Sequence, residues 1–120
     1  MAQFVLAIDQ GTTGSTVALM DARGALRATA NVEFPQLYPH PGWVEHRPKD
    51  IWASVLKGIS AILRRKVCKP GDIVAIGITN QRETALLWDT QTAEPLNNAI
   101  VWQCRRTTDF CESLRMAGHE

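Results

Sequence analysis

A segment near the start of the chain contains two glycines and four hydroxyl residues among eight positions: Asp9-Gln10-Gly11-Thr12-Thr13-Gly14-Ser15-Thr16. Glycine lets backbone amides approach an anion closely and hydroxyl groups add donors, so such a turn can bind phosphate oxygens without a basic side chain. An aspartate at this place can hold hydrated Mg²⁺ beside the phosphates. An ordinary tight turn of the same composition is the alternative. The predicted contacts are Asp9 for the metal and, for phosphate, Gly11, Thr12, Thr13, Gly14 and Ser15.

The dipeptide Arg82-Glu83 and the indole of Trp102 are the second candidate group. A guanidinium offers only donors and a carboxylate only acceptors, so the pair can engage neighbouring hydroxyl groups of a polyol in both senses. Trp102 offers a flat apolar wall for a carbon skeleton. An ion pair without a ligand and a core tryptophan are the alternatives.

Three further groups of residues have structural interpretations. No cysteine or serine nucleophile is visibly paired with His46 in the sequence, so we expect a structural role for it. Trp52 falls on the apolar side of a predicted helix and is expected in the core. Arg105-Arg106 opens the last predicted helix, where positive charge is unfavourable, which predicts a local partner, either an anion or a carboxylate.

Composition excludes some classes of partner. The 120 residues include 13 Lys+Arg and 12 Asp+Glu, for a net charge of +1, which predicts no general attraction to nucleic acid or anionic lipid. The first apolar run ends at Asp9, without a charged leader and far short of a membrane span, so we expect a cytoplasmic protein. An odd number of cysteines without a CxxC pair suits reduced thiols, expected as small buried residues: Cys68, Cys104 and Cys111.

The elements that position the first candidate are strands. The apolar run Phe4–Ile8 predicts a strand buried on both faces. Residues 16–20 and 25–34 predict two more strands, and the short turns between the three imply an antiparallel meander. The prolines between residues 35 and 48 predict irregular structure there.

A helix and a crossover strand follow from the apolar pattern after Asp50. Apolar residues recur at a helical period, namely at Ile51, Trp52, Val55, Leu56, Ile59, Ile62 and Leu63. Lys69-Pro70-Gly71 ends this helix. Residues 73–78 then predict a buried strand that rejoins the sheet in parallel, with Arg82-Glu83 at its carboxyl end.

The last part of the chain predicts two short strands and a helix. The strands cover residues 84–88 and 99–102, and the helix covers residues 108–116. This helix is expected to bury Phe110, Cys111 and Leu114 and to stop at Gly118. The predicted fold class is therefore α/β, with a mixed sheet.

In this setting, the segment that begins at Asp9 resembles the phosphate-binding hairpin of the actin-like ATPase and sugar kinase superfamily. Residues 41–46 (PGWVEH), 77–84 (GITNQRET) and 98–106 (NAIVWQCRR) are similar to the glycerol kinases of the FGGY carbohydrate kinase family, and the similarity extends over essentially the whole chain. The resemblance implies an RNase H-like fold and a cleft between two domains. It also implies ATP, Mg²⁺ and glycerol as ligands, and transfer of phosphate to give glycerol 3-phosphate.

The resemblance also implies roles for particular residues. Arg82 and Glu83 match the family residues that hydrogen-bond glycerol, and Trp102 matches a tryptophan of the substrate wall. Family members commonly carry serine and arginine where this chain has Gly14 and Thr16, which leaves a positive charge missing near the phosphates.

Family members are roughly four times longer than this chain. Residues 1–120 are therefore expected to be the amino-terminal part of the first kinase domain, without the second, nucleotide-side domain and without the general base. No catalytic residue is assigned, and the chain alone is expected to be inactive. We expect exposed strand edges to cause self-association, or the parent enzyme to be a homo-oligomer. A non-catalytic binding module and a kinase for another polyol or sugar are the alternative functions.

Overall fold

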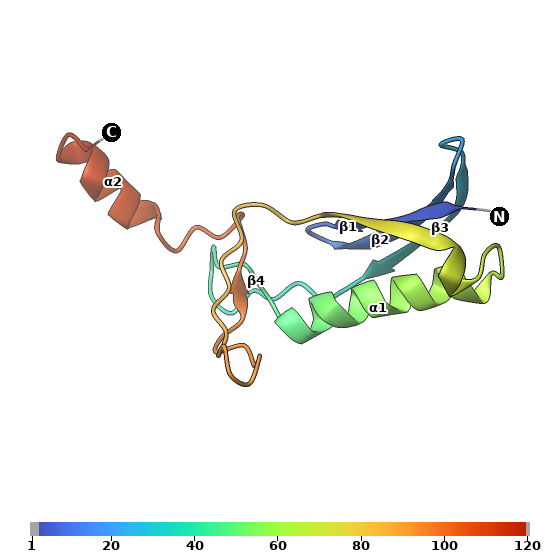
Figure 1. Cartoon of the computed structure of the whole chain (residues 1–120). Helices are drawn as coiled ribbons and strands as arrows, with labels where there is room; N and C mark the ends of the chain where they lie inside the picture. The colour runs from blue at the N-terminus through green and yellow to red at the C-terminus, as the bar shows by residue number, and fades with distance from the viewer. Residues whose placement is uncertain (1–2, 120) are drawn as a thin grey trace. The chain divides into compact units, whose positions relative to one another are not determined.

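A computed structural model describes residues 3–119, and these divide along the chain into two units (Figure 1). The first unit comprises the chain up to Pro35 together with Pro48–Arg82. The second comprises Gln36–Arg47 and the chain from Glu83 onward. No helix within the described residues has the length and apolar character needed to span a bilayer.

The first unit contains a four-stranded mixed sheet. Its strands are β1 (Phe4–Gln10), β2 (Gly14–Asp21), β3 (Leu26–Glu33) and β5 (Ile73–Thr79), in the order β3-β2-β1-β5. β1 pairs antiparallel with β2, β2 pairs antiparallel with β3, and β5 runs parallel to β1. The predicted meander and the parallel crossover strand are both confirmed.

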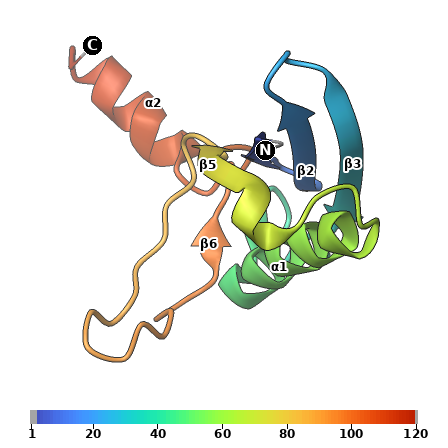
Figure 2. The same ribbon diagram turned by 45° about the vertical axis from the view of Figure 1, so that its right-hand side comes forward.

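Helix α1 (Pro48–Arg64) lies along one side of the meander, and a short 3-10 helix, η1 (Pro70–Asp72), leads into β5 (Figures 1 and 2). Pro48 suits the first turn of α1 because an N–H at that position has no partner within the helix. Gly58 lets α1 approach the sheet closely, since a Cβ there would lie 2.6 Å from Cγ2 of Val17. The core between helix and sheet consists of Phe4, Leu6, Ile8, Val17, Leu19, Ala28, Val55 and Ile62.

The prediction that Trp52 is a core residue is wrong, because its side chain is 64% exposed. The buried residues of α1 include two small ones, Ser54 and Gly58, which face the sheet. Trp52 lies more than about 100° around the helix from both of them. The apolar pattern of the helix was therefore broader than the stripe that the sheet covers.

The prediction that β5 is buried is also wrong. In the sheet register Ile76 lies beside the buried Leu6, and Ile78 beside the buried Ile8. Ile76 and Ile78 are nevertheless 60% and 73% exposed, because α1 packs on the meander and leaves the edge strand uncovered. Val5 on the other face of β1 is also exposed, so β1 is buried on one face rather than on both.

The second unit is built around a small antiparallel pair, β4 (Glu45–His46) and β6 (Ala99–Ile100). β4 lies in the segment that the prolines predicted to be irregular. The predicted strand 84–88 is reduced to single bridges, Ala85 with Ile100 and Trp88 with Pro95. Figure 2 shows β6 after the long loop of this region.

His46 has the structural role predicted for it. Its side chain is fully buried, and its Nε2 lies 2.6 Å from Oε1 of Gln36.

Helix α2 (Thr108–Met116) has the predicted bounds and ends before Gly118, whose φ is +82°. It does not bury the residues expected. Phe110, Cys111 and Leu114 are all exposed, because among the described residues no helix or strand of the second unit packs closely along α2. Cys68 and Cys104 are half-buried, so the expectation of buried thiols fails most clearly for Cys111.

Candidate functional site

The predicted phosphate hairpin is a tight turn between β1 and β2. The amide of Gly11 donates to the carbonyl of Gly14 at 2.9 Å and closes the turn. Thr12 is half-buried and Thr13 is exposed, so the turn is open to solvent at both threonines. A Cβ on Gly14 would lie 2.7 Å from the carbonyl oxygen of Val32, so packing against β3 requires glycine there.

The hydroxyl group of Ser15 faces α1. It is fully buried, and its Oγ lies 2.7 Å from Oγ of Ser54. Ser54 uses its own proton to donate to the carbonyl of Ile51 at 2.7 Å, so Ser15 is the donor of the pair. The side chain of Ser15 therefore anchors the hairpin to the helix and is not free for a phosphate oxygen.

A row of oxygen-bearing side chains crosses the sheet at Asp9. The register places Asp9 beside Thr79 on one side and beside Thr16 on the other. The Asn31 amide donates to Oγ1 of Thr16 at 2.8 Å. The sequence analysis missed Asn31, because its place in the row depends on the β2–β3 register. Carboxylate, hydroxyl and amide oxygens form a donor set that fits Mg²⁺.

The hairpin and Arg82 leave the first unit's sheet at the same edge. β1 and β5 are parallel, and Asp9 pairs with Thr79 at their carboxyl ends. The residues after each strand, including the exposed Arg82, therefore start from one edge. Ligands of α/β folds bind at such an edge.

Gln81 is a second residue that the sequence analysis missed. Its side chain is only 8% exposed, and neither amide atom has a hydrogen-bond partner among the described residues. Buried polar atoms of native proteins nearly always have a partner, so Gln81 marks a place where water or a ligand is expected.

Glu83 and Trp102 belong to the second unit. Glu83 has a φ of +54°, in the left-handed region that non-glycine residues rarely adopt, although Lys66 and Ala93 share this property. Trp102 is 50% exposed and is therefore not a core residue. Convergence of Glu83 and Trp102 with the hairpin stays a prediction.

A polar cluster of the second unit surrounds Arg106, and of the two partners expected for Arg105-Arg106, an anion or a carboxylate, the structure gives Arg106 a carboxylate. Its Nη2 lies 2.7 Å from Oε1 of Glu45, and its Nε donates to Sγ of Cys104 at 2.9 Å. Oε2 of Glu45 accepts from the Asn98 amide at 2.9 Å. The guanidinium carbon lies 3.8 Å from the ring centroid of Trp43, a cation–π contact.

Hydrogen bonds in this cluster lower the pKa of two side chains, Glu45 and Cys104. The pKa of Glu45 lies below its ordinary 4.5, because Asn98 and then Arg106 donate to the charged form. Burial raises the pKa of the Cys104 thiol, but hydrogen bonds led by that from Arg106 outweigh this and hold it below 9.0. Glu45 is therefore ionised at neutral pH and pairs with the charged Arg106.

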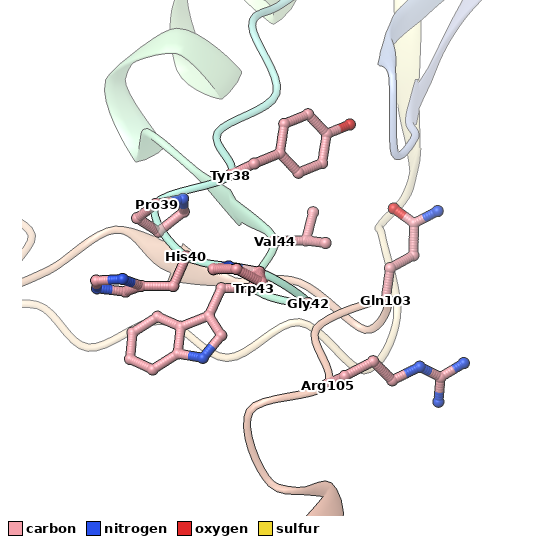
Figure 3. A pocket seen from close by; sticks show the side chains of 9 residues that line it. Tyr38, Pro39, His40, Gly42, Trp43, Val44, Gln103 and Arg105 are labelled. Atoms are coloured by element: carbon pink, nitrogen blue, oxygen red, sulfur yellow. The ribbon is translucent and has the colours of Figure 1, made fainter.

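Two pockets flank Trp43, and no residue of the sequence-predicted site lines either of them. The larger, about 550 Å³, lies between the segment of Tyr38 and His40 and the segment of Gln103 and Arg105 (Figure 3). The smaller, about 320 Å³, is lined by Trp43, Glu45, Asn97, Asn98, Ile100 and Arg106. Within residues 3–119 no three His, Cys, Asp or Glu side chains are grouped so as to hold a metal ion.

Comparison with known proteins matches residues 4–120 to the N-terminal domain of the FGGY family of carbohydrate kinases. The glycerol kinase of Halothermothrix orenii is 52% identical over 98% of this chain, and that of Caldanaerobacter subterraneus is 50% identical over 100%. The chain spans about a quarter of these relatives, 24% of each.

Solved structures agree with this match. Plasmodium falciparum glycerol kinase with ADP superposes with a TM-score of 0.84, at 32% identity, over 96% of this chain and 23% of that one. Gluconate kinase from Lactobacillus acidophilus has a TM-score of 0.89 over 99% of this chain and 23% of that one, and its 24% identity shows the fold alone. The predicted fold class, a mixed α/β sheet of the actin-like ATPase type, is confirmed.

Proposed function

Because this chain belongs to the FGGY family of carbohydrate kinases, we propose that it supplies the phosphate hairpin and one wall of the substrate site of a glycerol kinase. The reaction is ATP-dependent phosphorylation of glycerol to glycerol 3-phosphate. Glycerol is favoured over larger sugars because relatives about half identical to this chain are glycerol kinases, whereas the gluconate kinase shares the fold at much lower identity.

One observation carries the proposal: the hairpin after β1 and the Asn80–Arg82 segment after β5 start from the same edge of one sheet. A kinase must bring its nucleotide phosphate and its acceptor hydroxyl together, since phosphoryl transfer depends on positioning and charge stabilisation. Two ligand-binding segments on one edge suit that need.

The phosphate side of the site consists of the hairpin and Asp9. The backbone amides of Thr12, Thr13 and Gly14 and the hydroxyl of Thr13 donate to phosphate oxygens, while the Gly11 amide closes the turn. Asp9, with Thr79 and Thr16 beside it, holds hydrated Mg²⁺. When bound, Mg²⁺ neutralises charge that develops on the phosphates.

The glycerol side of the site consists of Arg82, Glu83 and Trp102. The guanidinium and the carboxylate bind adjacent hydroxyl groups, and the half-exposed indole covers the carbon chain. Gln81, with its buried amide, is a further donor and acceptor close to Arg82 in the chain. None of these residues is a general base.

We further propose that the chain is the amino-terminal part of the first kinase domain and is inactive alone. The general base and the nucleotide-side domain would belong to sequence that the longer relatives contain and this chain does not. Self-association of the isolated chain is supported by β5, an uncovered edge strand whose seven residues carry no charge. The cytoplasmic location stays a prediction.

The test places this chain within a full-length glycerol kinase. We expect a chimaera in which these 120 residues replace the matching quarter of the Halothermothrix orenii enzyme to phosphorylate glycerol. Glu83→Gln in the chimaera should lower kcat/KM at least about a hundredfold, because a hydroxyl group of glycerol loses its charged acceptor. Glu33→Gln on the exposed edge of β3 is the matched control and should change little.

Three outcomes would count against the proposal. A near-normal kcat/KM for Glu83→Gln removes the glycerol wall. A folded chimaera that prefers xylulose or gluconate supports the alternative substrate class. A folded chimaera without turnover on any of these supports the non-catalytic module.

A further inference from the structure

The smaller pocket beside Trp43 is lined mainly by residues of two motifs, 41–46 and 98–106, of which the proposed function uses only Trp102. We propose that this pocket binds a small neutral polyol, at a site separate from Arg82, Glu83 and Trp102. The inference does not rest on the proposed kinase function, because it uses different residues.

The size of the pocket limits the ligand. Its volume of about 320 Å³ is at the low end of the range for small-molecule sites, about 300 to 1,000 Å³. Trp43 and Ile100 supply apolar wall, and four polar residues supply the rest. A nucleotide is too large for such a pocket, whereas a chain of three to five carbons suits it.

The charge of the pocket favours a neutral ligand. Glu45 and Arg106 are its two charged residues, and they form an ion pair at 2.7 Å with side chains only 14% and 18% exposed. Their charges cancel, so neither an anion nor a cation gains from entering. A charged ligand would also lose its water without a partner of opposite charge.

The hydrogen-bonding capacity of the pocket suits hydroxyl groups. Arg106 has five N–H donors, of which Cys104 and Glu45 take one each. The carboxylate of Glu45 can accept about four hydrogen bonds and receives two. Donors and acceptors therefore remain on adjacent groups, and the amides of Asn97 and Asn98 add both kinds. Neighbouring hydroxyls of a polyol need this combination, because each both donates and accepts.

The pocket repeats the chemistry of the predicted glycerol wall. Each combines an arginine, a glutamate and a tryptophan. In the wall, Arg82 and Glu83 are neighbours in sequence; in the pocket, Glu45 and Arg106 are 61 positions apart and meet through folding. The pocket members already contact one another, with the guanidinium over the Trp43 ring, so the pocket is formed before any ligand arrives.

Binding can be measured on the 120-residue chain itself. Glycerol, erythritol and xylitol would each be titrated into ¹⁵N-labelled protein. At least one should cause saturable shifts of the side-chain amide signals of Asn97 and Asn98 and of the Trp43 indole N–H. Glycerol 3-phosphate should bind several-fold more weakly, because its charge finds no net positive partner.

Two variants assign the site. Asn97→Ala leaves the ion pair intact and should raise the Kd about three- to tenfold, the usual effect of one hydrogen bond. Glu45→Gln should raise it about tenfold or more, with intact β4 and β6 signals as the check on folding. Glu83→Gln, in the predicted glycerol wall, is the matched control and should leave these shifts unchanged.

The inference is overturned if none of the three polyols shifts these signals. It is also overturned if the Kd is unchanged in both Asn97→Ala and Glu45→Gln, or if Glu83→Gln abolishes the Trp43 shift. A failed kinase assay with the chimaera would not affect these results, so the two proposals can fail separately.

Discussion

Each of the two units is stabilised internally by a different kind of interaction. The first unit has an apolar core in which side chains of the meander, such as Leu6, Val17 and Leu19, pack against α1. The second unit has only a two-residue strand pair and a polar cluster around Arg106. Apolar packing depends on many contacts spread along the sequence, whereas the cluster depends on a few groups with fixed geometry. The units should therefore respond to different changes.

The largest expected effect is loss of the apolar core. Leu19 is fully buried, so Leu19→Ala should lower the free energy of unfolding of the first unit by about 3 kcal/mol. Leu26→Ala removes the same atoms from an exposed position of the same sheet and should cost less than about 1 kcal/mol. Urea unfolding followed by far-UV circular dichroism measures both. Equal losses would show that this core does not hold the unit.

A smaller and pH-dependent effect is expected in the second unit. Glu45→Gln removes the charge that pairs with Arg106 and should cost about 2 kcal/mol at pH 7. The pKa of Glu45 is lower in the folded state than its ordinary 4.5, so its stabilisation is present above pH 4.5 and is lost as pH falls through the folded pKa. The difference between the wild-type chain and the variant should therefore shrink at pH 3.

Tryptophan fluorescence separates this effect from the first unit. With Trp52→Phe as background, the remaining tryptophans, Trp43, Trp88 and Trp102, all lie in the second unit. A difference that stays constant between pH 7 and pH 3 would mean that the Glu45 charge does not stabilise this unit.

The smallest expected effect is a difference in thiol reactivity between one cysteine of each unit. In the first unit, burial and then Asp72 raise the pKa of Cys68, whereas in the second the hydrogen bonds led by Arg106 lower that of Cys104 despite burial. Since the thiolate reacts, Cys104 should be alkylated by iodoacetamide several times faster than Cys68 at pH 7.5, as measured by mass spectrometry. Arg106→Lys should reduce the ratio, and an unchanged ratio would contradict the assignment.

The first unit was largely predictable because its signals are local. Short apolar runs and tight turns indicated the meander, and the helical period indicated α1. The sequence did not indicate which apolar residues a neighbouring element covers: Trp52 and Ile76 are as apolar as core residues, but both side chains are more than half exposed. Periodicity shows which residues could be buried, and only the tertiary arrangement shows which are.

The second unit and parts of the site could not be predicted in the same way. The pairing of Glu45 with Arg106, and the row that includes Asn31, depend on contacts between distant segments. The direction of the Ser15 hydroxyl depends on Ser54 of α1. The motif around Arg82 was visible, because its members are neighbours in the chain.

The close packing of Gly14 against Val32 has a consequence for how this hairpin can vary. Any side chain at position 14 would push β3 away from the turn. A substitution of Gly14 therefore also moves the backbone of β3. Positions 12 and 13 are partly open to solvent and tolerate other side chains without such movement. A change at either threonine can therefore alter anion affinity without moving the backbone, whereas the serine that family members commonly carry at position 14 requires β3 to shift as well.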